Sequence, residues 1–193
     1  MKNQFQAKDI QKLVEIPKYR YEYIASKIGI KPEIEEVEKT GHTHLYSFKN
    51  LLEFAIVNTA NSLGIGPKAT REILIFLSNN LDLKDAGLFD LEKKIEASIH
   101  YADTNYGKFF KLSGASVSEQ GRKGGYTGKG FDKTKTGEVL KRLSSHEDNI
   151  NVPGFVEEYR NLSTLATMSL EDFDGFITIN LGKIKNRLLK KLK

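Results

Sequence analysis

Two of the four histidines in the chain, His42 and His44, stand two positions apart in the segment GHTHLYS. On a β-strand this spacing places both imidazole rings on one face. A zinc site needs at least three protein ligands, but the chain has no cysteine, and His100 and His146 lie in its other half. Three interpretations therefore stay open: a contact with a nucleic-acid backbone, an ordinary surface strand, or a metal site completed by nearby glutamates.

A second group of candidate residues is aromatic and basic, and it lies in the segment PKYRYEYIASKIGI. Its apolar residues recur at helical spacing and predict a buried stripe made by Tyr21, Ile24, Ala25 and Ile28. The predicted outer face and its margins then carry Lys18, Tyr19, Arg20, Tyr23 and Lys27. Arginine can bind guanine through two hydrogen bonds, and lysine suits phosphate. The alternative is an ordinary solvated helix face with exposed tyrosines.

A glycine-rich basic loop at residues 119–137 includes the run GRKGGYTGKGF. This run differs from the P-loop pattern G-x-x-x-x-G-K-[ST] in its spacing and in the residue after its lysine. It predicts a flexible loop or a basic arm that touches phosphate through Arg122, Lys123 and Lys129. We find no nucleophile elbow, no paired-carboxylate motif and no dinucleotide fingerprint. The sequence therefore predicts a protein that is not an enzyme and that has no cofactor or metal.

The N-terminal elements that would position these residues are mostly helical. Ile10, Leu13 and Val14 predict a first helix over residues 7–14, and Pro17 starts a second helix that Gly29 ends. Two short helices joined by about three residues are typical of a helix-turn-helix. A small hairpin is expected to follow. Two further helices then run to residue 80, with Leu63 in the buried stripe of the first.

The C-terminal half has a different pattern. Residues 81–107 have mixed, mainly helical character, whereas KFFKLSG and FDGFITINLG predict strands. Short helices are expected at EVLKRLSSH and VPGFVEEYRNLSTLA, and the chain ends in an amphipathic basic helix. The predicted fold class is α+β and mainly helical. The predicted domains are a DNA-binding domain at residues 1–80 and a small α+β domain for dimerisation or effector sensing at residues 81–193.

Composition limits the class of protein further. The 193 residues are 39% hydrophobic and 28% charged, with a formal net charge of +5. A basic chain permits an anionic partner but does not demand one, and residues 1–80 are nearly balanced with 11 basic and 9 acidic side chains. No apolar run reaches the length of a signal peptide or a membrane span. We expect a cytoplasmic protein that does not interact with membranes.

The segment HLYSFKNLLEFAIVNTANSLGIGPKATREIL, together with the expected order of helix-turn-helix, hairpin and two helices, resembles the MerR family of bacterial transcription regulators. Tyr46-Ser47, Leu63-Gly64 and Glu72-Ile73-Leu74 match that family's pattern. The resemblance implies a winged helix-turn-helix whose hairpin is the wing. The DNA contacts of the wing would come from Lys39, His42, His44 and the Tyr46 hydroxyl, and His44 stands where the family often has arginine. The contacts of the second helix would come from the residues of its outer face.

From these patterns we predict a sequence-specific transcription regulator that binds double-stranded operator DNA as a homodimer. Its small-molecule effector, if it has one, is undetermined by the sequence. Two alternatives stay open. One is an excisionase-like phage or plasmid factor that binds DNA for an architectural purpose. The other is an N-terminal module that binds a protein instead of DNA, which the balanced charge of residues 1–80 allows.

Overall fold

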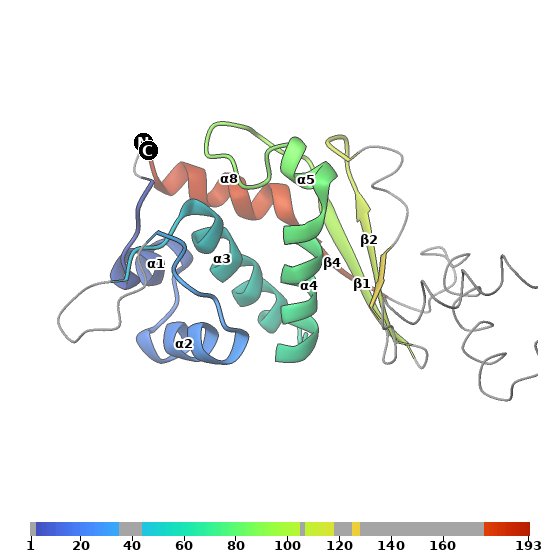
Figure 1. Cartoon of the computed structure of the whole chain (residues 1–193), viewed down its shortest axis with the longest axis horizontal. Helices are drawn as coiled ribbons and strands as arrows, with labels where there is room; N and C mark the ends of the chain where they lie inside the picture. Colours follow the sequence, from blue (N-terminus) through green and yellow to red (C-terminus); the bar gives the residue numbers. More distant parts are fainter. Residues whose placement is uncertain (1–2, 35–43, 105–106, 118–124, 128–175) are drawn as a thin grey trace, which may run out of the picture.

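The structure is a computed structural model, and it describes residues 3–34, 44–104, 107–117, 125–127 and 176–193. In this part of the chain, a group of helices packs on one face of a small antiparallel sheet (Figure 1). The predicted α+β class is therefore confirmed. None of the helices in the described ranges is long and apolar enough to cross a membrane.

The first two helices form as their sequence predicts. Helix α1 (Ala7–Val14) ends at Glu15, whose backbone is left-handed with φ 61°. Helix α2 (Lys18–Tyr23) follows after a three-residue link and continues directly into the π-helix η1 (Ile24–Ile28). Gly29 closes η1 with φ 81°, a conformation that glycine adopts without a steric penalty. The sequence does not predict the π-helical turn.

The next two helices supply most of the central core. Helix α3 (Phe48–Ser62) begins at Ser47, whose side chain accepts a hydrogen bond from the backbone N–H of Asn50 at 3.1 Å. Helix α4 (Pro67–Asn79) has its proline in the first turn, where no N–H is needed. One prediction here is wrong: Leu63 is 44% exposed, because α3 ends at Ser62 and the turn carries Leu63 off its buried face.

Strands follow a short fifth helix, α5 (Leu81–Asp85). They are β1 (Ser98–Thr104), β2 (Gly107–Ser113), β3 (Gly125–Thr127) and β4 (Ile177–Asn180), in the sheet order β3-β2-β1-β4. All neighbouring strands are antiparallel. The helical prediction for residues 81–107 is therefore wrong beyond α5. Ile99 and Tyr101 alternate toward the core, a strand pattern that the preceding charged residues obscure.

The last helix, α8 (Leu181–Lys191), starts directly from the end of β4. The predicted strand in FDGFITINLG and the predicted basic C-terminal helix are both present. Asn180 caps it by accepting a hydrogen bond from the backbone N–H of Lys183 at 2.7 Å. Gly182 is needed at this junction, because a Cβ atom there would lie 2.4 Å from the carbonyl oxygen of Ile95. The close approach joins α8 to the segment before β1.

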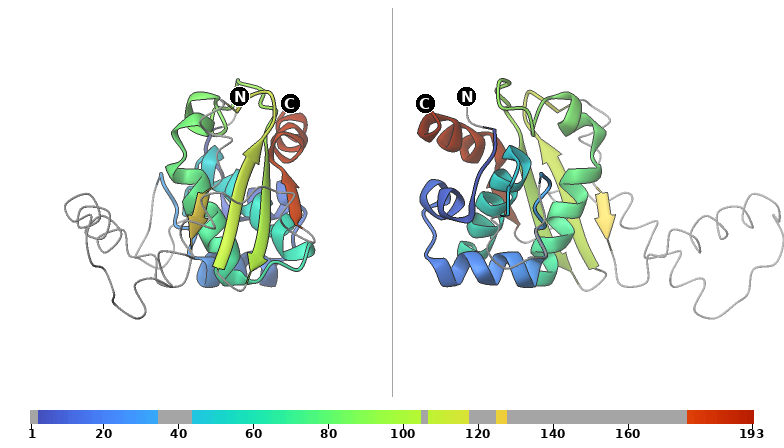
Figure 2. Two further views of the ribbon diagram at one scale, coloured as in Figure 1. Left: turned by 90° about the vertical axis from the view of Figure 1, so that its right-hand side faces the viewer. Right: turned by 60° about the vertical axis from the view of Figure 1, so that its left-hand side comes forward.

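The hydrophobic core runs without a break from the N-terminal helices to α8. Helix α8 returns to pack against α3 and α1 (Figures 1 and 2). At its last turn, the ammonium group of Lys191 lies 2.8 Å from the Glu15 carboxylate and donates to the carbonyl of Leu13, also at 2.8 Å. In the described residues, the predicted boundary at residue 80 does not separate two cores. The short helices predicted between residues 138 and 166 lie outside these residues, as does most of the glycine-rich loop.

Candidate nucleic-acid interface

Helices α2 and η1 expose one continuous face at the edge of the helical layer (Figure 1). Tyr19 is 72% exposed and Tyr23 is 41% exposed. Lys18 and Lys27 are exposed as well, as the sequence predicts. Tyrosines at positions i and i+4 lie on the same side of a helix, so the two rings are neighbours on this surface. The face combines aromatic rings with flexible cations.

The same face also carries one acidic residue that the predicted contacts did not include. Glu22 lies one helical turn after Lys18, and its carboxylate is 3.7 Å from the Lys18 ammonium group. Both side chains are more than half exposed, so this pair adds little stability. Glu22 is thus a solvent-accessible hydrogen-bond acceptor in the middle of the face.

The opposite side of α2 is anchored by aromatic residues in the core. The Tyr21 ring stacks on Phe54 of α3 with centroids 5.2 Å apart, and its hydroxyl lies 2.6 Å from the Tyr46 hydroxyl. Burial, followed by this hydrogen bond, raises the pKa of Tyr21 above its ordinary value. Tyr46 is only 2% exposed and pairs through its backbone with Phe5. The predicted DNA contact of the Tyr46 hydroxyl is therefore wrong, because the side chain is a core residue.

Arg20 holds α2 from a second direction. Its Nε donates to the Asn58 side-chain oxygen of α3 at 3.0 Å, and the side chain is half-buried. This contact helps to position α2. It uses one of the five N–H groups of the guanidinium, and the predicted contact of Arg20 with guanine stays a prediction. A partner 38 positions away could not be identified from the local pattern.

Arg71 of α4 provides a third anchor, which the sequence analysis missed. Its Nε donates to the carbonyl of Ile28 at 3.2 Å, and a terminal nitrogen donates to the carbonyl of Lys27. These carbonyls belong to the last turn of η1, where backbone acceptors lack partners within the helix. Arg71 therefore caps η1 and fixes its end to α4. An arginine near the start of an amphipathic helix gives no sequence signal of such a role.

The predicted wing is described only at its ends. Ile34 donates through its backbone to the carbonyl of Leu45 at 3.2 Å, so the two ends approach each other. His44 is exposed, and its ring centroid lies 6.5 Å from that of Tyr46. Lys39 and His42 lie outside the described residues. Their predicted contacts with DNA, and the shared face of the two histidines, remain predictions.

His100 takes part in a polar cluster on the sheet, far from α2 in the sequence. Its two ring nitrogens lie 2.9 Å from the Thr178 hydroxyl and 2.7 Å from the Ser113 hydroxyl. Burial and, to a lesser extent, the charge of Lys111 lower the pKa of His100. In the described ranges, no three potential metal ligands from histidine, cysteine, aspartate and glutamate lie together.

Comparison with known proteins adds no family to this description. Neither the protein-family models nor the curated protein sequences contain a match to the chain.

Proposed function

We propose that the protein is a transcription regulator that binds double-stranded DNA in a sequence-specific manner. In this proposal α1 and α2 form a helix-turn-helix, and the α2–η1 helix enters the major groove. Residues 39–46 would form the adjacent wing. The resemblance of residues 44–74 to the MerR family agrees with this arrangement.

The observation that carries the proposal is the contrast between the two sides of α2–η1. Its inner side is fixed to the core through Tyr21, Arg20 and the Arg71 cap. Its outer side exposes two tyrosines and two lysines. A helix that reads base edges must be held rigidly while its outer residues stay accessible, because each hydrogen bond to a base requires accurate placement. The anchors and the exposed side chains satisfy both requirements.

The exposed residues divide into two roles by their chemistry. Lys18 and Lys27 carry mobile positive charges, which suit phosphate oxygens and set affinity without reading sequence. Tyr19 and Tyr23 present rings that can contact thymine methyl groups, and hydroxyls that can hydrogen-bond to base edges. We also propose that the protein acts as a homodimer, because one such helix spans only a short half-site and two-fold pairing doubles the contact.

The proposal is tested by fluorescence anisotropy with labelled genomic fragments at several salt concentrations. We expect one fragment to bind more tightly than the others, with affinity that falls as salt rises. Lys27→Ala should weaken binding to all fragments about equally and lower the salt slope by about 1. Tyr19→Ala should reduce the preference among fragments. Lys94→Ala is the matched control, because Lys94 is exposed on the segment between α5 and β1, which Figure 1 draws at the top of the molecule, whereas α2 lies at the bottom. Equal affinity of the parent protein for every fragment would refute the proposal.

A further inference from the structure

A groove of about 490 Å³ lies beside the end of η1, between the segment after Gly29 and the helices α3 and α4. It is open to solvent along one side. Its lining is neither wholly apolar nor of one charge. The cationic residues Lys31 and Arg71, the acidic Glu53 and the apolar pair Leu74 and Ile75 all line it. A ligand that fits this groove must therefore carry both charged and apolar parts.

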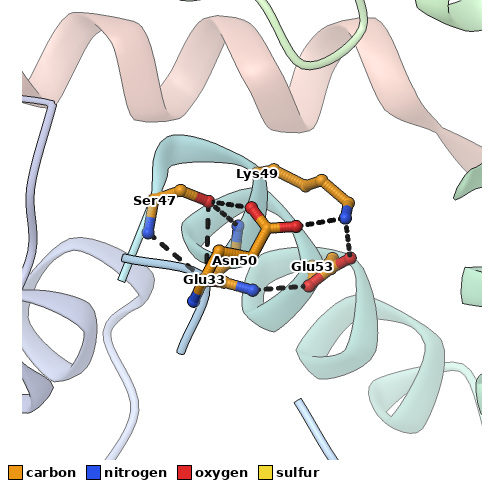
Figure 3. Close-up of polar contacts among 5 residues, drawn as sticks. All are labelled: Glu33, Ser47, Lys49, Asn50 and Glu53. Atoms are coloured by element: carbon orange, nitrogen blue, oxygen red, sulfur yellow. Dashed lines mark hydrogen bonds and ion pairs between the residues drawn. The ribbon is translucent and has the colours of Figure 1, made fainter. Parts of the chain in front are cut away.

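The floor of the groove is a hydrogen-bonded network at the start of α3 (Figure 3). The Lys49 ammonium group contacts the Glu33 carboxylate closely, but it is 3.9 Å from Oε1 of Glu53. The Ser47 hydroxyl donates to the other carboxylate oxygen of Glu33 at 2.5 Å, and the Asn50 amide donates to Oε2 of Glu53 at 3.0 Å. Lys49 therefore forms a hydrogen-bonded ion pair with Glu33 but only a longer ion pair with Glu53.

Glu53 is the unusual member of this network. The residue is only 9% exposed. Burial is the largest cause of a raised pKa of its carboxyl; the Asn50 amide and the Lys49 charge lower this pKa, and the Glu33 charge raises it. Oε1 accepts no hydrogen bond from any residue in the described ranges. A nearly buried carboxylate is costly unless donors surround it. An ammonium group in the groove would supply the donor that Oε1 lacks.

The rim of the groove offers the complementary charge. Arg71 uses two N–H groups on the carbonyls of Lys27 and Ile28, and a guanidinium has five. The remaining N–H groups can bind a carboxylate, for which arginine has the matching geometry. Lys31 is exposed and has no ion-pair partner among the described residues. A carboxylate at the rim would thus meet two positive charges.

The wall between floor and rim is apolar. Leu74 and Ile75 lie three and four positions after Arg71 on α4, so all three side chains occupy neighbouring positions on one side of the helix. Ile75 lines the groove and is 52% exposed. Covering it with an apolar group would remove that surface from water.

We propose that this groove binds a small zwitterion with one primary ammonium group, one carboxylate and an apolar side chain or spacer. The ammonium group binds Glu53, the carboxylate binds Arg71 and Lys31, and the apolar part covers Ile75. Because Arg71 also caps η1, the ligand contacts a residue that positions the candidate DNA-binding face. The binding itself does not depend on the proposed function.

The test is isothermal titration calorimetry of the full chain with leucine, phenylalanine and ε-aminocaproate as probes. We expect at least one of them to bind. Its analogues that lack one charge, such as isoamylamine and isocaproate for leucine, should bind at least tenfold more weakly. Glu53→Gln should weaken the zwitterion at least tenfold. Glu92→Gln, which removes an exposed carboxylate outside the groove, should not.

A second variant guards against misfolding of Glu53→Gln. Lys31→Ala removes an exposed side chain, and it should weaken the zwitterion while leaving the binding of the amine-only analogue unchanged. If none of the three probes binds the parent protein at millimolar concentration, the proposal is overturned. Equal zwitterion affinity in the parent and in Glu53→Gln also overturns it. Anisotropy with DNA is measured on the same samples, so failure of the groove proposal and failure of the DNA proposal appear as separate results.

Discussion

Lys185 allows a quantitative prediction, because it is a fully buried lysine in α8, the C-terminal helix that packs against α1. Its ammonium group donates to the carbonyl of Gly87 at 2.5 Å and lies 5.9 Å from the centroid of the Phe48 ring. Burial lowers the pKa of Lys185 from 10.5 to about 8, although the charge of Asp90 raises it. The contacts therefore compensate only part of the cost of burying the charge.

The sign of the pH dependence follows from proton binding. In the unfolded chain Lys185 keeps its proton up to about pH 10.5, whereas in the folded chain it loses the proton near pH 8. Between these values the unfolded state binds more protons, so the free energy of unfolding rises with pH. One pKa unit corresponds to about 1.4 kcal/mol, so the whole interval contributes about 3 kcal/mol. About 2 kcal/mol of this falls between pH 7 and about pH 9.5.

Urea unfolding followed by circular dichroism measures this contribution in the parent protein and in Lys185→Met. Methionine keeps a long unbranched side chain without the charge. The stability of the parent relative to the variant should rise by about 2 kcal/mol between pH 7 and about pH 9.5. Tyr21, whose pKa is raised, changes stability in the opposite direction above about pH 10, but both proteins contain it. Lys183→Met, an exposed position on the same helix, is the control. A constant difference between the parent and Lys185→Met over this range would refute our account of the buried charge.

Two further predictions concern α2. Tyr21→Phe removes the buried hydrogen bond to Tyr46 and should lower stability by about 1 kcal/mol, a shift of about 2–4 °C in the melting temperature for a chain of this size. Tyr23→Phe, which changes an exposed tyrosine on the same helix, should melt with the parent, and equal melting of both variants would contradict the anchoring role of Tyr21. Glu22→Gln should relax the preference for cytosine at one base position about tenfold, since a carboxylate accepts a hydrogen bond from the cytosine amino group. Glu92→Gln should leave that preference unchanged. If selection from random DNA gives the same site for Glu22→Gln as for the parent, Glu22 does not contact a base.

The elements that local sequence determines were predicted well. Pro67 and Gly29 mark helix ends because their backbone chemistry restricts where they fit, and Ser47 marks the start of α3 because its hydroxyl caps the first turn. Strand β1 was missed because the charged residues 90–96 before it favour a helical interpretation. The alternation of Ile99 and Tyr101 is also short.

The candidate site was predicted less completely, because its geometry depends on distant partners. The exposure of Lys18, Tyr19 and Tyr23 follows from helical periodicity alone. The contact between Arg20 and Asn58 could not be predicted, because Asn58 lies on another helix. Tyr46 was assigned to the surface because its pairing with Phe5 brings together segments that are 41 positions apart, which no local pattern reveals. The same limitation hid the Arg71 cap.

We propose that the exposed face of α2–η1 reads DNA sequence. Selection from a pool of random double-stranded DNA, carried out in parallel with the parent protein and with a Tyr19→Ala, Tyr23→Ala double variant, tests it most directly. We predict that the parent enriches one motif with two-fold symmetry and that the double variant loses this enrichment while keeping its circular dichroism spectrum. Enrichment of the same motif by both proteins, or of no motif by the parent, would contradict the claim.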